Sequence, residues 1–318
     1  MNPSARRDHD SRIREQLVHD LGPQICGFLE NPRVIEIMLN PDGTLWVEYL
    51  GEEMKMFGEM SARRAESLIA TVASALNETI NAHSPTLQGE LPFYGSRFQA
   101  LLPPVVAKPT FTIRQRAIMV FTLKDYVKQG IMSESQNCVI QEAVRAHHNI
   151  LIVGGTGSGK TTLTNAVIQN IVAYHSSDRL VILEDTRELQ CSAANSVLLR
   201  VAEHADMTQL LKLTLRMRPD RILVGEVRDG AALALLKAWN TGHPGGVATI
   251  HANSARDRLV RIEQLIAEAT PSPVPSLIAK AVNLIVFIRK RGGKREVSEL
   301  VEVQGYDGQN YITQTVGG

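Results

Sequence analysis

One short segment of the sequence has the composition and spacing of a phosphate-binding loop. Residues 154–161 read Gly-Gly-Thr-Gly-Ser-Gly-Lys-Thr, and two of the glycines are separated by four residues and followed by lysine and threonine. Glycine lets backbone N–H groups approach an anion without a clash from Cβ, and a helix that starts after such a loop directs its positive end to the same point. The segment therefore predicts a binding site for nucleotide phosphates.

Each position of this segment has an expected role. Lys160 is expected to reach the β- and γ-phosphates, and Thr161 is expected to bind the Mg²⁺ that bridges them. The remaining positions are expected to surround the phosphates, and they are Gly154, Gly155, Thr156, Gly157, Ser158, Gly159 and Thr162. ATP and Mg²⁺ are thus the predicted cofactors.

The elements that must position this loop can be recognised on both sides of it. From about residue 133, short apolar runs alternate with helical patterns. The runs are Ile150–Val153, Leu180–Leu183, Arg221–Val224, Val247–Ile250 and Leu284–Ile288. Such alternation predicts an α/β fold in which a parallel sheet is covered by helices on both faces.

Acidic and imidazole side chains end three of these runs, at Glu184, Glu226 and His251. In parallel sheets, ligands bind at the carboxyl ends of the strands, so we expect these side chains near the phosphates. Glu226 is expected to orient or deprotonate the attacking water, because phosphoryl transfer depends mainly on positioning and charge neutralisation. Whether Glu226 or Glu184 takes the proton is open. His251 is expected to donate to the γ-phosphate or to Glu226.

The first 120 residues have a different, mixed pattern. Strands are expected at 34–39, 44–49, 97–102 and 110–114, and a helix at 62–76. We therefore expect a smaller α+β domain at 1–120, a linker at 121–133 and a P-loop domain at 134–318.

The bulk composition restricts the class of protein. The 318 residues are 44% hydrophobic and 21% charged, and the formal net charge of +1 gives no overall electrostatic reason to bind nucleic acid. The three cysteines, Cys26, Cys138 and Cys191, are far apart, which favours a reducing compartment. The longest apolar run near the end, 277–288, is too short to span a bilayer. These features predict a cytoplasmic protein.

Four segments in this order and spacing resemble the secretion ATPases of type II and type IV systems. They are the P-loop at 154–161, the acidic segment at 184–188, the segment at 225–228 and the histidine-containing segment at 242–251. Residues 97–104 and 111–114 also resemble this family. The short chain resembles the conjugative-transfer branch most. The type II branch carries a tetracysteine metal module, and its absence here weighs against that branch.

The resemblance implies a RecA-like P-loop domain joined to a PAS-like N-terminal domain, a ring of six subunits and ATP bound between the two domains. It implies that Glu226 is the catalytic carboxylate, Glu184 its supporting partner and His251 a γ-phosphate sensor. It also implies that Arg97 and Arg114 lie over the nucleotide, in cis or in trans.

The function that follows is a hexameric, Mg²⁺-dependent ATPase that energises a conjugative type IV secretion system, in pilus biogenesis or in DNA–protein transfer. Inner-membrane components are the expected partners, with peripheral membrane contact and no stable binding of nucleic acid. The alternatives are a pilus-retraction or type II secretion motor, a RecA-like nucleic-acid translocase, and a nucleotide-gated binding module that does not hydrolyse.

Overall fold

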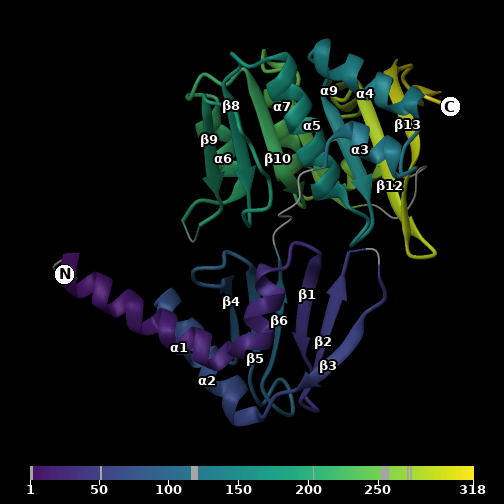
Figure 1. The fold of residues 1–318 in the computed structure, drawn as a ribbon. Helices are drawn as coiled ribbons and strands as arrows, with labels where there is room; N and C mark the ends of the chain where they lie inside the picture. Colours follow the sequence, from purple (N-terminus) through teal and green to yellow (C-terminus); the bar gives the residue numbers. More distant parts are fainter. Residues whose placement is uncertain are drawn as a thin grey trace. The chain divides into compact units, whose positions relative to one another are not determined.

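The chain divides into two structural units, residues 1–119 and 120–318 (Figure 1). The computed structural model describes residues 3–50, 52–115, 121–202, 204–251, 258–270, 272 and 274–318. The domain boundary expected at residue 120 falls within 116–120, outside the described residues.

The first unit is built on a six-stranded antiparallel sheet with the strand order β3-β2-β1-β6-β5-β4 (Figure 1). Its strands are β1 (Val34–Leu39), β2 (Thr44–Tyr49), β3 (Lys55–Glu59), β4 (Thr86–Glu90), β5 (Arg97–Leu101) and β6 (Thr110–Arg114). Helices α1 (Pro3–Glu30) and α2 (Ala62–Leu76) share one buried apolar cluster with alternate residues of the strands. The helix and four strands predicted in this region are confirmed to within one residue.

The second unit is built on an eight-stranded sheet with the order β14-β13-β12-β7-β11-β10-β8-β9. The six strands from β12 to β9 are parallel, and β13 and β14 are antiparallel additions at one edge. The strands are β7 (Ile150–Gly154), β8 (Leu180–Glu184), β9 (Ser196–Arg200), β10 (Arg221–Val227), β11 (Val247–His251), β12 (Leu284–Arg291), β13 (Lys294–Tyr306) and β14 (Tyr311–Val316). All five predicted apolar runs are therefore confirmed as strands of a parallel sheet.

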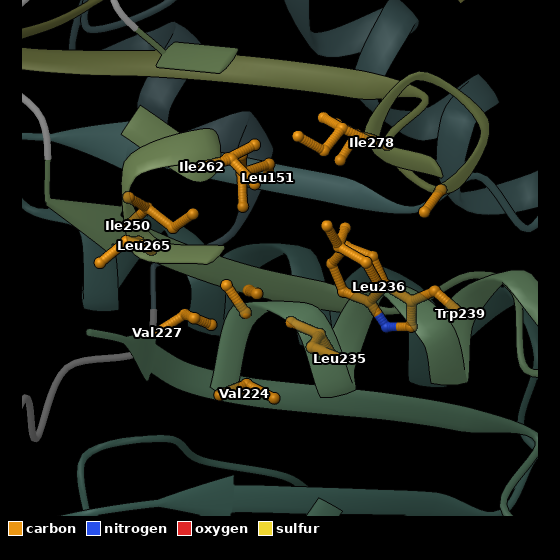
Figure 2. Close-up of a cluster of buried hydrophobic side chains, with 14 of the residues drawn as sticks. Leu151, Val224, Val227, Leu235, Leu236, Trp239, Ile250, Ile262, Leu265 and Ile278 are labelled. Atoms are coloured by element: carbon orange, nitrogen blue, oxygen red, sulfur yellow. The ribbon is translucent and has the colours of Figure 1, made fainter. Parts of the chain in front are cut away.

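Helices cover both faces of this sheet. Successive residues of a strand point to opposite faces, so each face has its own apolar cluster that helices bury. Ile150 and Ile152 pack in the cluster that includes α3 (Leu123–Lys128), α4 (Glu134–Arg145) and α5 (Lys160–Tyr174). Leu151 and Val153 pack in the cluster that includes α6 (Met207–Thr214), α7 (Ala231–Asn240), α8 (Arg258–Ala267) and α9 (Pro275–Ala281). Figure 2 shows this second cluster, with Leu235, Leu236 and Trp239 of α7 against the sheet.

Three segments of the second unit differ in detail from the sequence-based expectations or add to them. The segment expected as a linker, 121–133, contains α3, whose Leu123 and Tyr126 are buried in a core cluster of the second unit. Helix α9 begins at Pro275, a first-turn position where the missing N–H of proline costs nothing. The C-terminal strands β13 and β14 have no counterpart among the elements predicted above.

Within the described part of the chain, no helix is both long enough and apolar enough to cross a membrane.

Candidate active site

The predicted phosphate-binding loop lies between strand β7 and helix α5. Strand β7 ends at Gly154 and helix α5 begins at Lys160. Gly157 and Gly159 have φ angles of 68° and 99°, which residues with a side chain rarely adopt. A β-carbon at Gly154 would lie 2.2 Å from the carbonyl oxygen of Ile288, so a larger residue would push β7 away from β12. The loop therefore requires glycine at these three positions for backbone reasons.

The polar groups of the loop fit a nucleotide polyphosphate. Lys160 Nζ donates hydrogen bonds to the carbonyl oxygens of Gly154 (2.8 Å) and Gly155 (3.0 Å), so the ammonium group is held over the loop. The hydroxyl of Ser158 is the one buried side-chain group that lacks a hydrogen-bond partner among the described residues. An unpaired buried hydroxyl is unfavourable. A phosphate oxygen would satisfy Ser158 and would bring a negative charge to Lys160.

Thr161 contacts the acidic segment that follows strand β8. Its hydroxyl donates a hydrogen bond to Glu188 Oε2 at 2.9 Å. Glu184 is 4% exposed, and one of its oxygens accepts the backbone N–H groups of Glu188 (2.8 Å) and Leu189 (2.7 Å). Glu184 thus fixes the backbone that carries Glu188, and Glu188 is the carboxylate that reaches the helix after the P-loop.

Glu188 is a site residue to which the sequence alone gave no separate role. Hydroxyl and carboxylate oxygens suit Mg²⁺, so Thr161 and Glu188 together fit the metal that was predicted at Thr161. Asn165, fully buried on α5, reinforces this arrangement through bonds to the Glu188 carbonyl oxygen (3.3 Å) and the Gln190 N–H (2.9 Å). The only available signal was the position of Glu188 in the acidic segment, because the contact joins two distant parts of the sequence.

Glu226 lies at the carboxyl end of β10 and is paired with Arg228. Two guanidinium nitrogens of Arg228 lie 2.7 and 2.6 Å from Glu226 Oε2, and a third lies 3.1 Å from Asp185 Oδ2. Burial lowers the pKa of Arg228, whereas the hydrogen bond to Glu226 and the charges of Glu226 and Asp185 raise it. Together the two carboxylates outweigh burial, so the pKa of Arg228 lies above its ordinary value. Arg228 therefore links the ends of β10 and β8 and orients Glu226, a role that the sequence did not reveal.

Gly225 allows Glu184 to lie across strand β10. A β-carbon at Gly225 would lie 3.1 Å from Glu184 Cγ, which is tighter than ordinary packing. The carbonyl oxygen of Gly225 accepts a hydrogen bond from the Thr249 hydroxyl at 2.6 Å. Strands β8, β10 and β11 are therefore connected at this edge by side chains as well as by their backbones.

His251 ends strand β11 beside the P-loop. It is the register partner of Gly154, the first residue of the loop, in the parallel pairing of β11 with β7. The other histidine of the same segment, His243, lies before β11, where its Nδ1 is 2.9 Å from the carbonyl oxygen of Pro219. Of these two histidines, His251 is therefore the one that lies at the carboxyl edge of the parallel sheet.

The carboxyl ends of four adjacent strands thus hold the predicted groups of the second unit. In spatial order these are Gly154 on β7, His251 on β11, Glu226 on β10 and Glu184 on β8. Ligands of open α/β sheets bind at this edge. The arrangement provides anion-binding N–H groups, a lysine, a hydroxyl–carboxylate pair and a carboxylate held by an arginine, which are the parts that phosphoryl transfer uses.

Arg97 and Arg114 lie in the first unit, directly opposite each other on β5 and β6. Like charges in this position repel, but acidic residues flank them in the same row across the sheet. Glu90 pairs in register with Arg97, and Glu36 pairs with Arg114. Burial raises the pKa of Glu36, and Arg114 opposes that rise. The two arginines therefore form a positive pair on the sheet face opposite to the apolar core.

Comparison with known proteins agrees with the family resemblance seen in the sequence. The profile of the type II/IV secretion system protein family matches residues 77–311. The chain is 53% identical over 305 residues to a probable conjugal transfer protein TrbB of Sinorhizobium fredii, covering 96% of this chain and 94% of that protein. It is 51% identical over 308 residues to the conjugal transfer protein TrbB of Rhizobium radiobacter, covering 97% and 95%.

Solved structures show the same fold. The pilus retraction motor PilT with bound ADP matches with a TM-score of 0.62 at 20% identity, covering 92% of this chain and 82% of that chain. The ATPase DotB of Legionella pneumophila matches with a TM-score of 0.61 at 19% identity, covering 84% and 76%. The family profile covers most of the sequence and the curated relatives cover nearly all of it, so the chain belongs to the type II/IV secretion system protein family.

Proposed function

We propose that this protein is an ATP hydrolase that energises a conjugative type IV secretion system. The observation that carries the proposal is that the P-loop, His251, Glu226 and Glu184 occupy the carboxyl ends of four adjacent parallel strands. Two relatives that are 53% and 51% identical to it over the aligned residues are named conjugal transfer proteins, which supports conjugation as the process served.

In this proposal residues 154–162 bind the phosphates of ATP. The backbone N–H groups of the loop and of the first turn of α5 donate to phosphate oxygens. Lys160 exchanges its bonds to the Gly154 and Gly155 carbonyl oxygens for the β- and γ-phosphates. Thr161 and Glu188 hold Mg²⁺, which neutralises charge on the phosphates when it is bound.

Glu226 orients or deprotonates the attacking water. The Arg228 guanidinium holds Glu226 Oε2 from the side of β8, which fixes the carboxylate at the strand end. Glu184 supports the reaction through the backbone that it holds, because its oxygen accepts the N–H groups of Glu188 and Leu189. His251, beside Gly154, senses the γ-phosphate.

We extend the proposal to the arginine pair of the first unit. Negative charge on the transferring phosphoryl group is stabilised by arginine, whose planar fork can bind two oxygens. Arg97 and Arg114 are two such forks held side by side. Replacing either by alanine should lower turnover more than it weakens ATP binding, whether the pair acts in its own subunit or in a neighbour.

The larger assembly is also part of the proposal. The domains are an α+β, PAS-like domain at 1–120, a linker at 121–133 and a RecA-like domain at 134–318. The order β12-β7-β11-β10-β8, with the P-loop strand inside it, supports the RecA-like assignment. Six subunits form a head-to-tail ring. The ring is cytoplasmic, docks peripherally on inner-membrane components of the apparatus and forms no stable complex with nucleic acid.

Steady-state phosphate release by the purified protein tests the proposal. The wild type should release phosphate from ATP in a Mg²⁺-dependent manner, and Lys160→Ala should abolish this release. Lys237→Ala on α7 is a matched control outside the site that should retain activity. Unchanged turnover in Lys160→Ala would exclude the P-loop as the site of hydrolysis.

The biological process needs a separate measurement in cells. A conjugative plasmid that carries Lys160→Ala in this protein should transfer at background frequency, and the Lys237→Ala plasmid should transfer normally. Normal transfer with the Lys160→Ala protein would contradict a role in conjugation.

A further inference from the structure

Arg295 lies against the P-loop although it is distant in sequence and belongs to the hairpin between β12 and β13. A β-carbon built on Gly159 would lie 3.1 Å from Arg295 Cδ and 3.3 Å from Arg295 Nε. Gly159 is the residue before Lys160, with which helix α5 begins. The half-buried side chain of Arg295 therefore approaches the amino end of that helix.

This position is electrostatically unfavourable for a guanidinium group on its own. The amino end of a helix carries a partial positive charge, and the Lys160 ammonium lies over the same loop. Within the described part of the chain, the side chain of Arg295 makes neither a hydrogen bond nor an ion pair. By contrast, Arg289 of the same hairpin is paired with Glu296. An anion at the loop would compensate the positive charges of Arg295, Lys160 and the helix end together.

The strand order determines which part of a bound nucleotide Arg295 faces. The P-loop strand β7 lies between β11 and β12. On the β11 side are His251, Glu226 and Glu184, the groups proposed to act at the γ-phosphate. Arg295 approaches from the β12 side. A polyphosphate that points its γ end toward the carboxylates has its α- and β-phosphates nearer to β12.

We propose that Arg295 is a nucleotide-binding residue that contacts the α- and β-phosphates within the subunit that supplies the P-loop. The inference rests on the proposed nucleotide function and adds a residue to it. Because ATP and ADP share the α- and β-phosphates, the contact is equally strong before and after hydrolysis. It therefore raises affinity for both nucleotides and leaves the chemical step unchanged.

Calorimetric titration of the full-length protein with Mg-ADP tests this inference. Arg295→Ala should weaken ADP binding roughly 10- to 100-fold, the loss expected for a hydrogen bond to a charged group. Arg295→Lys keeps the charge but loses the planar, forked guanidinium group, so its ADP affinity should lie between those of the wild type and Arg295→Ala. Arg291→Ala removes the same charge at the exposed end of the hairpin, and its affinity should stay within about twofold of the wild type.

Turnover measurements separate binding from catalysis. Arg295→Ala should raise the KM for ATP by a factor similar to the loss of ADP affinity, with kcat within about threefold of the wild type. A wild-type ADP affinity in Arg295→Ala would overturn the inference, as would a fall in kcat at unchanged affinity. An equal loss of affinity in Arg291→Ala would also overturn it, because the effect would then be one of general charge.

Folding and the underlying function are controlled separately. Thermal unfolding without nucleotide identifies a variant that fails to fold, and Arg295→Lys then carries the test. ADP binding needs no hydrolysis, so a wild type that binds ADP but releases no phosphate would contradict the ATPase proposal and leave the test of Arg295 valid. A wild type that binds no ADP would overturn both.

Discussion

The carboxylates at the edge of the parallel sheet differ in what they contact, and this difference separates their roles. Glu184 is buried and accepts two backbone N–H groups, so its contacts hold a loop in place. Glu188 accepts the hydroxyl of Thr161 and is therefore at the expected metal position. Glu226 is held by Arg228. Of the three, we expect Glu226 to act on the attacking water.

Glu226→Gln should retain ATP binding and lose turnover by about 10²-fold or more, because the amide keeps the shape of the side chain but cannot accept a proton. Phosphate release and ATP titration on the same preparation measure the two effects. Glu268→Gln at an exposed position is the control. If Glu226→Gln loses ATP binding instead, the carboxylate maintains the structure of the site or binds the metal, and it does not act on the attacking water.

Glu188→Gln should raise the Mg²⁺ concentration needed for half-maximal turnover by roughly tenfold, because groups next to a metal site typically change its affinity by 10- to 100-fold. Turnover across a Mg²⁺ titration measures this change, and Glu142→Gln on the exposed surface of α4 is the control. An unaltered Mg²⁺ requirement would mean that Glu188 only fixes the Thr161 hydroxyl.

At the scale of elements, the amino ends of the strands are joined by a polar cluster centred on Arg221. This fully buried arginine donates to Asp178 Oδ2 (2.6 Å), to the Gly245 carbonyl oxygen (3.0 Å) and to the Val144 carbonyl oxygen (3.4 Å). It thereby connects the start of β10 to the segments that precede β8 and β11 and to α4. His175 lies in the same cluster and is adjacent to the same Val144 oxygen (3.2 Å).

His175 should make folding stability depend on pH in the weakly acidic range. Burial, and then the charge of Arg221, lowers the pKa of His175 below its ordinary value near 6.5. The unfolded chain therefore binds the proton more readily than the folded chain. The contribution of neutral His175 to folding stability is full above a pH of about 6.5 and is lost as the pH falls below that value. Urea unfolding should show that the free energy of unfolding falls less between pH 7.5 and pH 5.5 for His175→Gln than for the wild type.

The exposed His83 provides the matched control for that experiment. His83→Gln should lose as much stability as the wild type between the two pH values. Equal losses in the His175→Gln and wild-type proteins would contradict the assignment.

Helix α7 packs so closely on the sheet that Gly246 has no room for a side chain. The Trp239 indole N–H donates to the Ile222 carbonyl oxygen at 3.1 Å. A β-carbon on Gly246 would lie 2.1 Å from Trp239 Nε1 and 2.4 Å from that same oxygen. Gly246→Ala should therefore destabilise the protein by about 1–3 kcal/mol, as overpacking does, measured by urea unfolding.

Gly27→Ala is a suitable comparison, because nothing lies within 4 Å of a β-carbon on this helical glycine. Alanine there should leave stability unchanged or raise it by up to about 1 kcal/mol. Destabilisation of both variants to the same extent would point to a general effect of replacing glycine and would contradict the packing argument.

How far the sequence predicts these elements depends on whether the information is local. The five apolar runs and the P-loop carry their own signals, and the structure has strands and a loop at those positions. Strand β9 and helix α6 were not predicted. The apolar residues of β9 are only partly buried at the edge of the sheet, and the eight residues of α6 are too few for a clear helical pattern. The contacts of Glu188 with Thr161 and of Arg295 with Gly159 join distant segments, and only the order of the strands brings them together.

For the whole molecule, the two units have distinct tasks in the proposed motor. The second unit supplies the P-loop and the acidic edge, and the first unit supplies the pair Arg97 and Arg114. Hydrolysis would drive secretion if the state of the nucleotide changed the relation between such units, as in other nucleotide switches. All of this depends on the terminal phosphate lying at the carboxyl edge of β10 and β11.

A structure of the protein with Mg²⁺ and a non-hydrolysable ATP analogue tests this dependence most directly. We predict that the phosphates lie along residues 154–162, with the terminal phosphate closest to Glu226 and His251 and with Mg²⁺ at Thr161. A terminal phosphate on the β12 side of the loop, or an analogue bound away from the P-loop at saturating concentration, would contradict the account.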